Sequence, residues 1–185
     1  MRTFKRILSQ LHRYVFWAVI STMLWAWIFF VFVVDTTPKH KVEVYTSDSV
    51  IVLDREFSLE LSKDPLPDGI RMVKVHPFSY AMFDTSAPIG ADLYIVSESE
   101  IETTIEGLCP LPVRDGNDYV SNGEVYGWRI YDAAAKTGAA SAYMRFALDE
   151  NYYLCANATS LHLGSQNDSK DDAAIVIAER ILSTP

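Results

Sequence analysis

Polar side chains that could hold a small solute follow the predicted strands of this chain at the points where those strands end. In open α/β sheets, ligands bind in the crevice beyond the carboxyl ends of the strands, where loops and helix N-termini present polar groups. The sequence therefore predicts a solute-binding crevice at this edge of a sheet. The candidate lining residues are Ser47, Asp48, His76, Ser79, Tyr80, Ser97, Ser99, Ser160 and His162.

Each of these residues also has an ordinary structural role that fits the same pattern. Serine and aspartate are common in turns and helix caps, and Ser97 with Glu100 three residues later has the form of a capping box. His76 stands at a strand end before Pro77, where a histidine can be a ligand contact, a pH-responsive group or a structural residue. Both interpretations remain open for each residue.

A catalytic serine is a less favoured alternative. A Ser/His/Asp set could be drawn from Ser160, either His76 or His162, and Asp84. The sequence has no GxSxG turn to expose a nucleophile, so we expect a non-enzymatic protein and keep a membrane-tethered hydrolase as the alternative. The sequence also has no CxxC motif, HExxH motif or Cys/His cluster, so we expect neither a metal nor a cofactor.

The elements that must position these residues differ between the two halves of the chain. In the first half, short β-rich runs alternate with helical patterns, which by the crossover rule predicts parallel βαβ units. The last of these helices begins directly at the predicted capping box. The expected strands are 41–46, 50–53, 70–75 and 91–96, and the expected helices are 56–63 and 97–107.

The second half has the pattern of an antiparallel meander followed by a C-terminal helix. Asn122-Gly123 is a strong tight-turn pair, and further polar turns separate the later apolar runs. The expected strands are 119–120, 124–131, 142–148 and 152–156, and the expected amphipathic helix is 168–182. The fold class predicted for the whole domain is therefore α/β or α+β, with one mixed sheet.

An apolar run without a charged residue, Tyr14–Val34, precedes this domain. As a helix it would cover the ~30 Å of a hydrocarbon core, and it is too long for the apolar region of a cleaved signal peptide. Four basic residues and no acidic one stand before it, which predicts a cytoplasmic N-terminus. We expect a basic tail over 1–13, a transmembrane helix over 14–34, a linker over 35–40 and an extracytoplasmic domain over 41–185.

The charge of the expected outer domain indicates which partners it can bind, and its two cysteines raise the question of a disulfide. All 24 acidic residues and 12 of the 16 basic ones follow residue 34, a formal charge of −12 that makes nucleic acid an unsuitable partner. About 150 residues suffice for one domain with its own core. Cys109 and Cys155 would lie in an oxidising compartment, where they either form a disulfide or remain two buried thiols.

Three segments, KVEVYT, ADLYIVSESEIE and NYYLCANATSLHLG, resemble the extracytoplasmic solute-binding proteins of bacterial ABC transporters. The chain has about half the length of a two-lobed member, so the resemblance implies a single-lobe or degenerate form. It is also similar to bacterial membrane-anchored proteins with one anchor and a compact α/β ectodomain. We therefore expect a single-pass, membrane-anchored binding or accessory module for a small solute. The alternative is a structural partner subunit of a membrane protein assembly.

Overall fold

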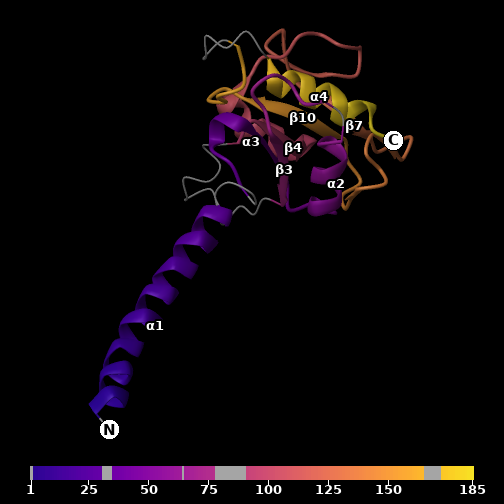
Figure 1. Ribbon diagram of the computed structural model, residues 1–185. Coiled ribbons are helices and arrows are strands. Elements are labelled where there is room, and N and C mark those ends of the chain that lie inside the picture. The colour runs from indigo at the N-terminus through magenta and orange to yellow at the C-terminus, as the bar shows by residue number, and fades with distance from the viewer. Residues whose placement is uncertain (1, 31–34, 64, 78–90, 165–171) are drawn as a thin grey trace. The chain divides into compact units, whose positions relative to one another are not determined.

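The chain forms two compact units. The computed structural model describes residues 2–30, 35–63, 65–77, 91–164 and 172–185. Residues 1–37 make up the first unit and residues 38–185 the second. The second unit is the mixed α/β domain that the sequence predicts, with a mixed sheet and a C-terminal helix (Figure 1).

The first unit contains helix α1 (Arg2–Phe29), which begins before the predicted apolar span and includes most of the predicted basic tail. In the part of the chain that the structure describes, no helix combines the length and the apolar character needed to cross a membrane. The expected transmembrane helix therefore gains no support from the structure. The last four residues of the predicted span, 31–34, lie outside the described residues.

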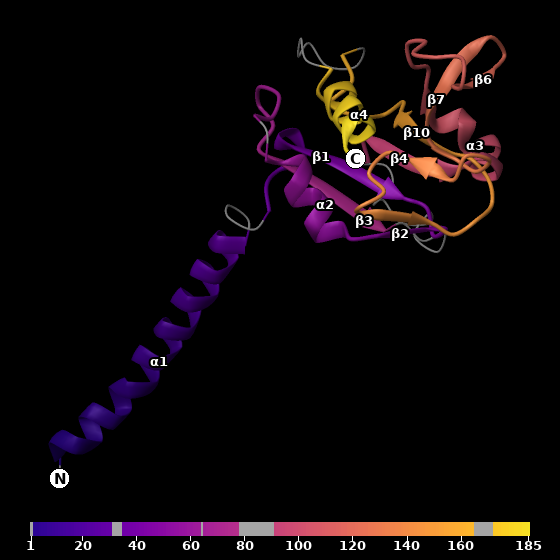
Figure 2. The same ribbon diagram turned by 90° about the vertical axis from the view of Figure 1, so that its right-hand side faces the viewer.

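The main sheet of the second unit joins a parallel half to an antiparallel half. Strand β1 lies between β3 and β4 and is parallel to both, as expected for βαβ units. Strand β10 then pairs antiparallel with β4 and β7, and β6 forms the far edge beside β7 (Figure 2). In spatial order the strands are β3 (Met72–Pro77), β1 (Lys41–Thr46), β4 (Leu93–Ser97), β10 (Tyr152–Asn157), β7 (Glu124–Asp132) and β6 (Tyr119–Ser121).

The predicted meander is wrong for one of its strands. Strand β9 (Met144–Phe146) leaves the main sheet and pairs with β2 (Val50–Val52) in a separate two-stranded sheet. An alternating run has the same appearance in the sequence whichever strand it pairs with, so local pattern could not assign this partner. Two further short strands extend the main sheet, β5 (Leu108–Cys109) beside β10 and β8 (Thr137–Gly138) beside β7.

Helices cover the two faces of the sheet differently. Helices α2 (Asp54–Leu61) and α4 (Ala173–Ser183) bury Phe57, Leu61 and Ile177 against one face in the larger core cluster. Helix α3 (Glu98–Thr104) places Ile101 against Tyr153 on the other face. Two short 3-10 turns complete the unit, η2 (Pro38–His40) and η5 (Ile105–Gly107).

Local signals in the sequence place the ends of several elements. Ser97 and Glu100 form the predicted capping box at the start of α3. Asn122 and Gly123 adopt positive φ values of 52° and 86° in the turn between β6 and β7, as this dipeptide predicts. The prediction that β3 ends before His76 is wrong, because β3 is an edge strand and there tolerates Pro77 as its last residue.

Both cysteines carry free thiols, so the predicted alternative of a disulfide is not formed in this structure. Cys155 is fully buried beside Ile101 and Tyr153, whereas Cys109 packs against the larger core cluster on the opposite face of the sheet. Burial raises the pKa of both thiols. The two sulfurs therefore lie on different faces although their strands, β5 and β10, are neighbours.

Candidate functional site

The carboxyl ends of β1 and β4 carry a network of serine hydroxyls and carboxylates. The Glu100 Oε1 atom accepts a hydrogen bond from Ser47 Oγ at 2.8 Å, and its Oε2 atom accepts from Ser97 Oγ at 3.0 Å. Ser99 donates from its backbone N to Glu150 Oε2 at 3.0 Å and from its hydroxyl to Glu150 Oε1 at 3.2 Å. The structure thus brings Ser47, Ser97 and Ser99 into one network of hydrogen bonds.

This carboxyl-end network satisfies its own hydrogen bonds. Ser97 is fully buried, and Ser47 is 4 % exposed. A solute entering between these hydroxyls would have to replace their bonds to Glu100. Asp48 is exposed beside the network. The ordinary capping role of Ser97 is therefore realised, and no open crevice is needed to explain these residues.

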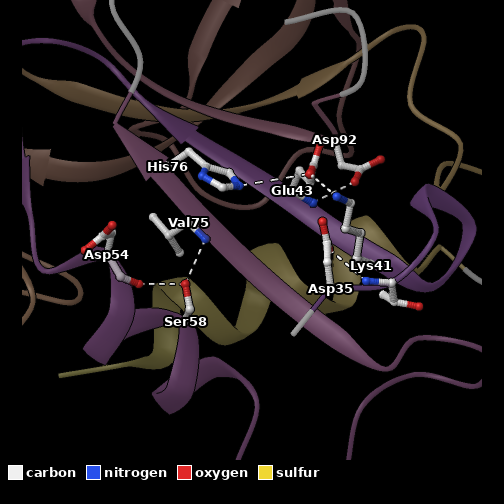
Figure 3. Close-up of polar contacts among 9 residues, drawn as sticks. Asp35, Lys41, Glu43, Asp54, Ser58, Val75, His76 and Asp92 are labelled. Atoms are coloured by element: carbon white, nitrogen blue, oxygen red, sulfur yellow. Dashed lines mark hydrogen bonds and ion pairs between the residues drawn. The ribbon is translucent and has the colours of Figure 1, made fainter. Parts of the chain in front are cut away.

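A half-exposed polar cluster lies on β1 and β3, on the face of the sheet opposite to α2 and α4. Since Val42 and Val44 point into the larger core, the alternating residues Glu43 and Tyr45 point to the other side. Lys41 Nζ lies 2.7 Å from Glu43 Oε1, and His76 Nε2 lies 4.0 Å from the same oxygen (Figure 3).

The environment of His76 favours its neutral form. Its side chain is 38 % exposed, and its ring lies 5.2 Å from the Tyr45 ring, centroid to centroid. Burial lowers the pKa of His76, and the Glu43 carboxylate opposes this shift. Burial and Glu43 together raise the pKa of Tyr45. Tyr45 is 8 % exposed, so the accessible part of this pair is mainly the His76 imidazole.

A second network lies at the opposite end of the parallel strands, where β4 begins. Asp92 is 2 % exposed and accepts hydrogen bonds from Ser160 Oγ at 2.5 Å and from the Glu43 backbone N at 2.8 Å. The Ser160 hydroxyl oxygen accepts from the His162 backbone N at 3.0 Å. Burial raises the pKa of Asp92, although its bonds from Ser160 and Glu43 oppose the shift.

Ser160, His162 and Asp92 do not form a catalytic triad. The Ser160 hydroxyl donates to Asp92 and not to an imidazole, so the serine–histidine bond of a triad is not formed. The His162 ring instead places Nε2 2.9 Å from the Pro38 carbonyl oxygen, to which it donates. Ser160 and His162 are 2 % and 7 % exposed, so this amino-end network is buried inside the domain.

The predicted site residues are therefore divided between separate places. Ser47, Ser97 and Ser99 share the carboxyl-end network, His76 lies on the half-exposed face of β3, and Ser160 and His162 lie at the amino end. Ser79, Tyr80 and the alternative acid Asp84 fall outside the described residues. Among the residues that the structure does describe, no group of His, Cys, Asp or Glu side chains could hold a metal ion.

Sequence reasoning missed two acidic residues that organise these networks, Asp92 and Glu43. Asp92 interrupts the apolar run Ala91–Val96, and Glu43 stands inside the β-rich segment Lys41–Thr46. A carboxylate in such a run is rarely buried without partners, so its presence was an available sign of a polar network. The hydrogen-bond partners are distant in the chain, since Asp92 lies 49 positions after Glu43 and 68 positions before Ser160.

Comparison of this chain with protein-family models, with curated proteins and with solved structures finds no match. Its function therefore has to be argued from its own residues.

Proposed function

We propose that this chain is a non-enzymatic, membrane-tethered accessory module whose α/β domain lies outside the cytoplasm. In this proposal the apolar run Tyr14–Val34 is the anchor and the four basic residues before it hold the N-terminus in the cytoplasm. The acidic domain that follows would remain soluble at the membrane surface. The sequence pattern and the surface of α1 both support this assignment.

The observation that carries the proposal is the exposure of large apolar side chains along α1. Trp17, Trp25 and Trp27 are 65 %, 68 % and 61 % exposed, and Phe16 and Met23 are exposed as well. From Tyr14 to Phe29 this helix has no charged residue, and its exposed large apolar side chains favour burial in lipid or in other protein, because their contact with water is unfavourable. In the sequence, the apolar residues continue beyond the end of α1 as far as Val34.

Alkaline extraction of membranes from cells that express the full chain tests this proposal. We expect the wild-type chain to stay with the membrane pellet. Leu24→Arg places a charge near the middle of the run at a cost of about 3 kcal/mol and should release a large fraction of the chain. Leu59→Arg, at an exposed position on α2, is the matched control and should behave as wild type. Release of the wild-type chain by alkali would contradict the proposal.

Within this module we propose the His76–Tyr45 surface as the contact for a small solute. The serine hydroxyls at the strand ends are already bonded to Glu100 and Glu150, whereas His76 keeps part of its ring accessible. Thermal shift of the full chain in detergent with a panel of amino acids, sugars and organic acids tests this surface. A shift that His76→Ala abolishes and Ser97→Ala preserves would support it. No shift with any solute, together with a co-purifying membrane protein, would favour a partner subunit instead.

A further inference from the structure

The N-terminal turns of α1 carry only positive charge, and this charge lies along one face of the helix. Since α1 turns by about 100° at each residue, the basic positions of this segment share an arc of about 100°. These positions are Arg2, Lys5, Arg6 and Arg13, and residues 1–34 contain no acidic residue. The opposite face has the apolar positions Phe4, Ile7, Leu8 and Leu11. The start of α1 is therefore a basic amphipathic helix.

The basic face ends at a hollow in the surface of α1. Helix α1 continues without a break from the charged segment into the apolar run (Figure 1). Phe16 and Trp17 are 61 % and 65 % exposed, and their ring centroids lie 6.1 Å apart in an edge-to-face contact. The hollow has a volume of about 410 Å³ and is lined by His12, Arg13, Phe16 and Trp17. It thus joins two basic side chains to an aromatic floor.

A phospholipid fits both parts of this hollow. A guanidinium can bind two phosphate oxygens through parallel N–H donors, and tryptophan is favoured at the level of the lipid headgroups. The proposed anchor places Arg13 at this level, because the uncharged run begins at Tyr14. The first acidic residue of the chain, Asp35, follows the apolar run. The sequence around the hollow therefore contains no carboxylate that would repel an anionic headgroup.

We propose that His12, Arg13, Phe16 and Trp17 form a binding site for an anionic phospholipid of the cytoplasmic leaflet. The Arg13 guanidinium binds the lipid phosphate, and the two aromatic rings contact the beginning of the acyl chains. The basic positions that precede Arg13 on the same face add to the attraction through their charge. A lysine or arginine near an anionic membrane surface contributes about a fivefold gain in association. This inference rests on the proposed membrane anchor and names the lipid class that the anchor selects.

Quenching of Trp17 fluorescence by brominated lipids tests the site. The full chain with Trp25→Phe and Trp27→Phe keeps two tryptophans, Trp17 at the hollow and Trp128, which is 2 % exposed, in the domain. Phosphatidylcholine vesicles contain a fraction of either phosphatidylglycerol or phosphatidylcholine that is brominated on its acyl chains. We expect brominated phosphatidylglycerol to associate with the Trp17 site about fivefold better, and high salt to reduce this preference. Equal quenching by the two lipids would refute the site and leave the proposed anchor standing, whereas no quenching by either would contradict the proposed function itself.

Variants and a phosphate control distinguish a site from general charge attraction and from binding of free phosphate. Arg13→Gln should remove the preference, whereas Arg55→Gln, at an exposed arginine of the domain, should keep it. Leu11→Arg with Arg13→Leu keeps the net charge but moves the arginine about 160° around α1, and it should also remove the preference. If this double variant kept the wild-type preference, charge alone would attract the lipid and the site would be overturned. Inorganic phosphate that abolishes the preference, where sodium chloride of equal ionic strength does not, would identify free phosphate as the ligand and contradict the assignment to lipid.

Discussion

Two networks of serine hydroxyls and carboxylates lie at opposite ends of β1 and β4, and burial separates their roles. At the amino end, Asp92 and Ser160 are each 2 % exposed. At the carboxyl end, the network runs from the buried Ser47 and Ser97 to the exposed Ser99. The same residue types thus make a fully buried polar network at one end and, at the other, a buried helix cap that extends to the exposed Ser99. Their identity alone does not indicate a binding site.

Removal of the buried Asp92 carboxylate at the amino end should cause the largest loss of stability. Asp92→Ala leaves the Glu43 N–H and the Ser160 hydroxyl without their acceptor, and we expect a loss of about 3 kcal/mol in the free energy of unfolding. Pulse proteolysis of the full chain in detergent measures it. Asp92→Asn is the matched control, because its amide can accept from Glu43 N and donate to Ser160, and it should lose clearly less. An equal loss for both variants would show that the charge, and not the hydrogen bonds, matters.

Removal of the Glu100 carboxylate at the carboxyl end should cause a smaller loss of stability. Glu100→Ala removes an acceptor for Ser47 and Ser97, but these two hydroxyls keep hydrogen-bond partners in Ser49 and Ser99. We expect a loss of about 1 kcal/mol in the free energy of unfolding. Urea titrations of Glu100→Ala and Asp92→Ala under the same conditions give the ratio. A larger loss for Glu100→Ala would reverse the proposed order of the two ends.

Titration of Asp92 should make the stability of the domain depend on pH, and we expect this effect to be smaller than that of the deletions above. Burial raises its pKa in the folded state above the ordinary 3.8, so the folded state holds the proton more tightly than the unfolded chain. Its contribution to stability is complete below about pH 3.8 and declines as the pH rises through the folded-state pKa. Relative to Asp92→Asn, the wild-type chain should therefore lose stability as the pH rises above about 3.8. A difference that stays constant or grows in favour of wild type would show that burial does not control this group.

The sequence predicted the capping box of the carboxyl-end network because that part of the network is local, whereas its bonds from Ser47 to Glu100 and from Ser99 to Glu150 span 53 and 51 positions. Ser97, Ser99 and Glu100 belong to one strand-to-helix junction, and the capping box follows from spacing alone. The amino-end network joins Asp92 to Ser160 across 68 positions, and nothing in either segment specifies the other. Strand β9 shows the same limit, since its alternation predicted a strand but not its pairing with β2. Contacts between distant segments depend on packing of the whole domain, which a local pattern does not encode.

Substitution of the half-exposed histidine should have the smallest effect on stability. His76→Ala removes a ring that lies on Tyr45 and is 4.0 Å from Glu43, in a position that is 38 % exposed. We expect a change in the free energy of unfolding of under about 0.5 kcal/mol. His162→Ala, which removes a buried ring and its bond to Pro38, should cost about 1–2 kcal/mol. Parallel thermal unfolding of both variants checks the order, and equal losses would mean that the His76 ring stabilises the fold as the buried one does.

Protease treatment of intact cells tests most directly whether the domain lies outside the cytoplasm on a retained anchor. Protease added to sealed cells that express the full chain should digest residues 38–185 and leave an N-terminal fragment with the membrane. Cells and lysates should then yield the same loss of the domain. A domain that survives in intact cells and is digested only after lysis would contradict the proposed orientation and, with it, the membrane-tethered function.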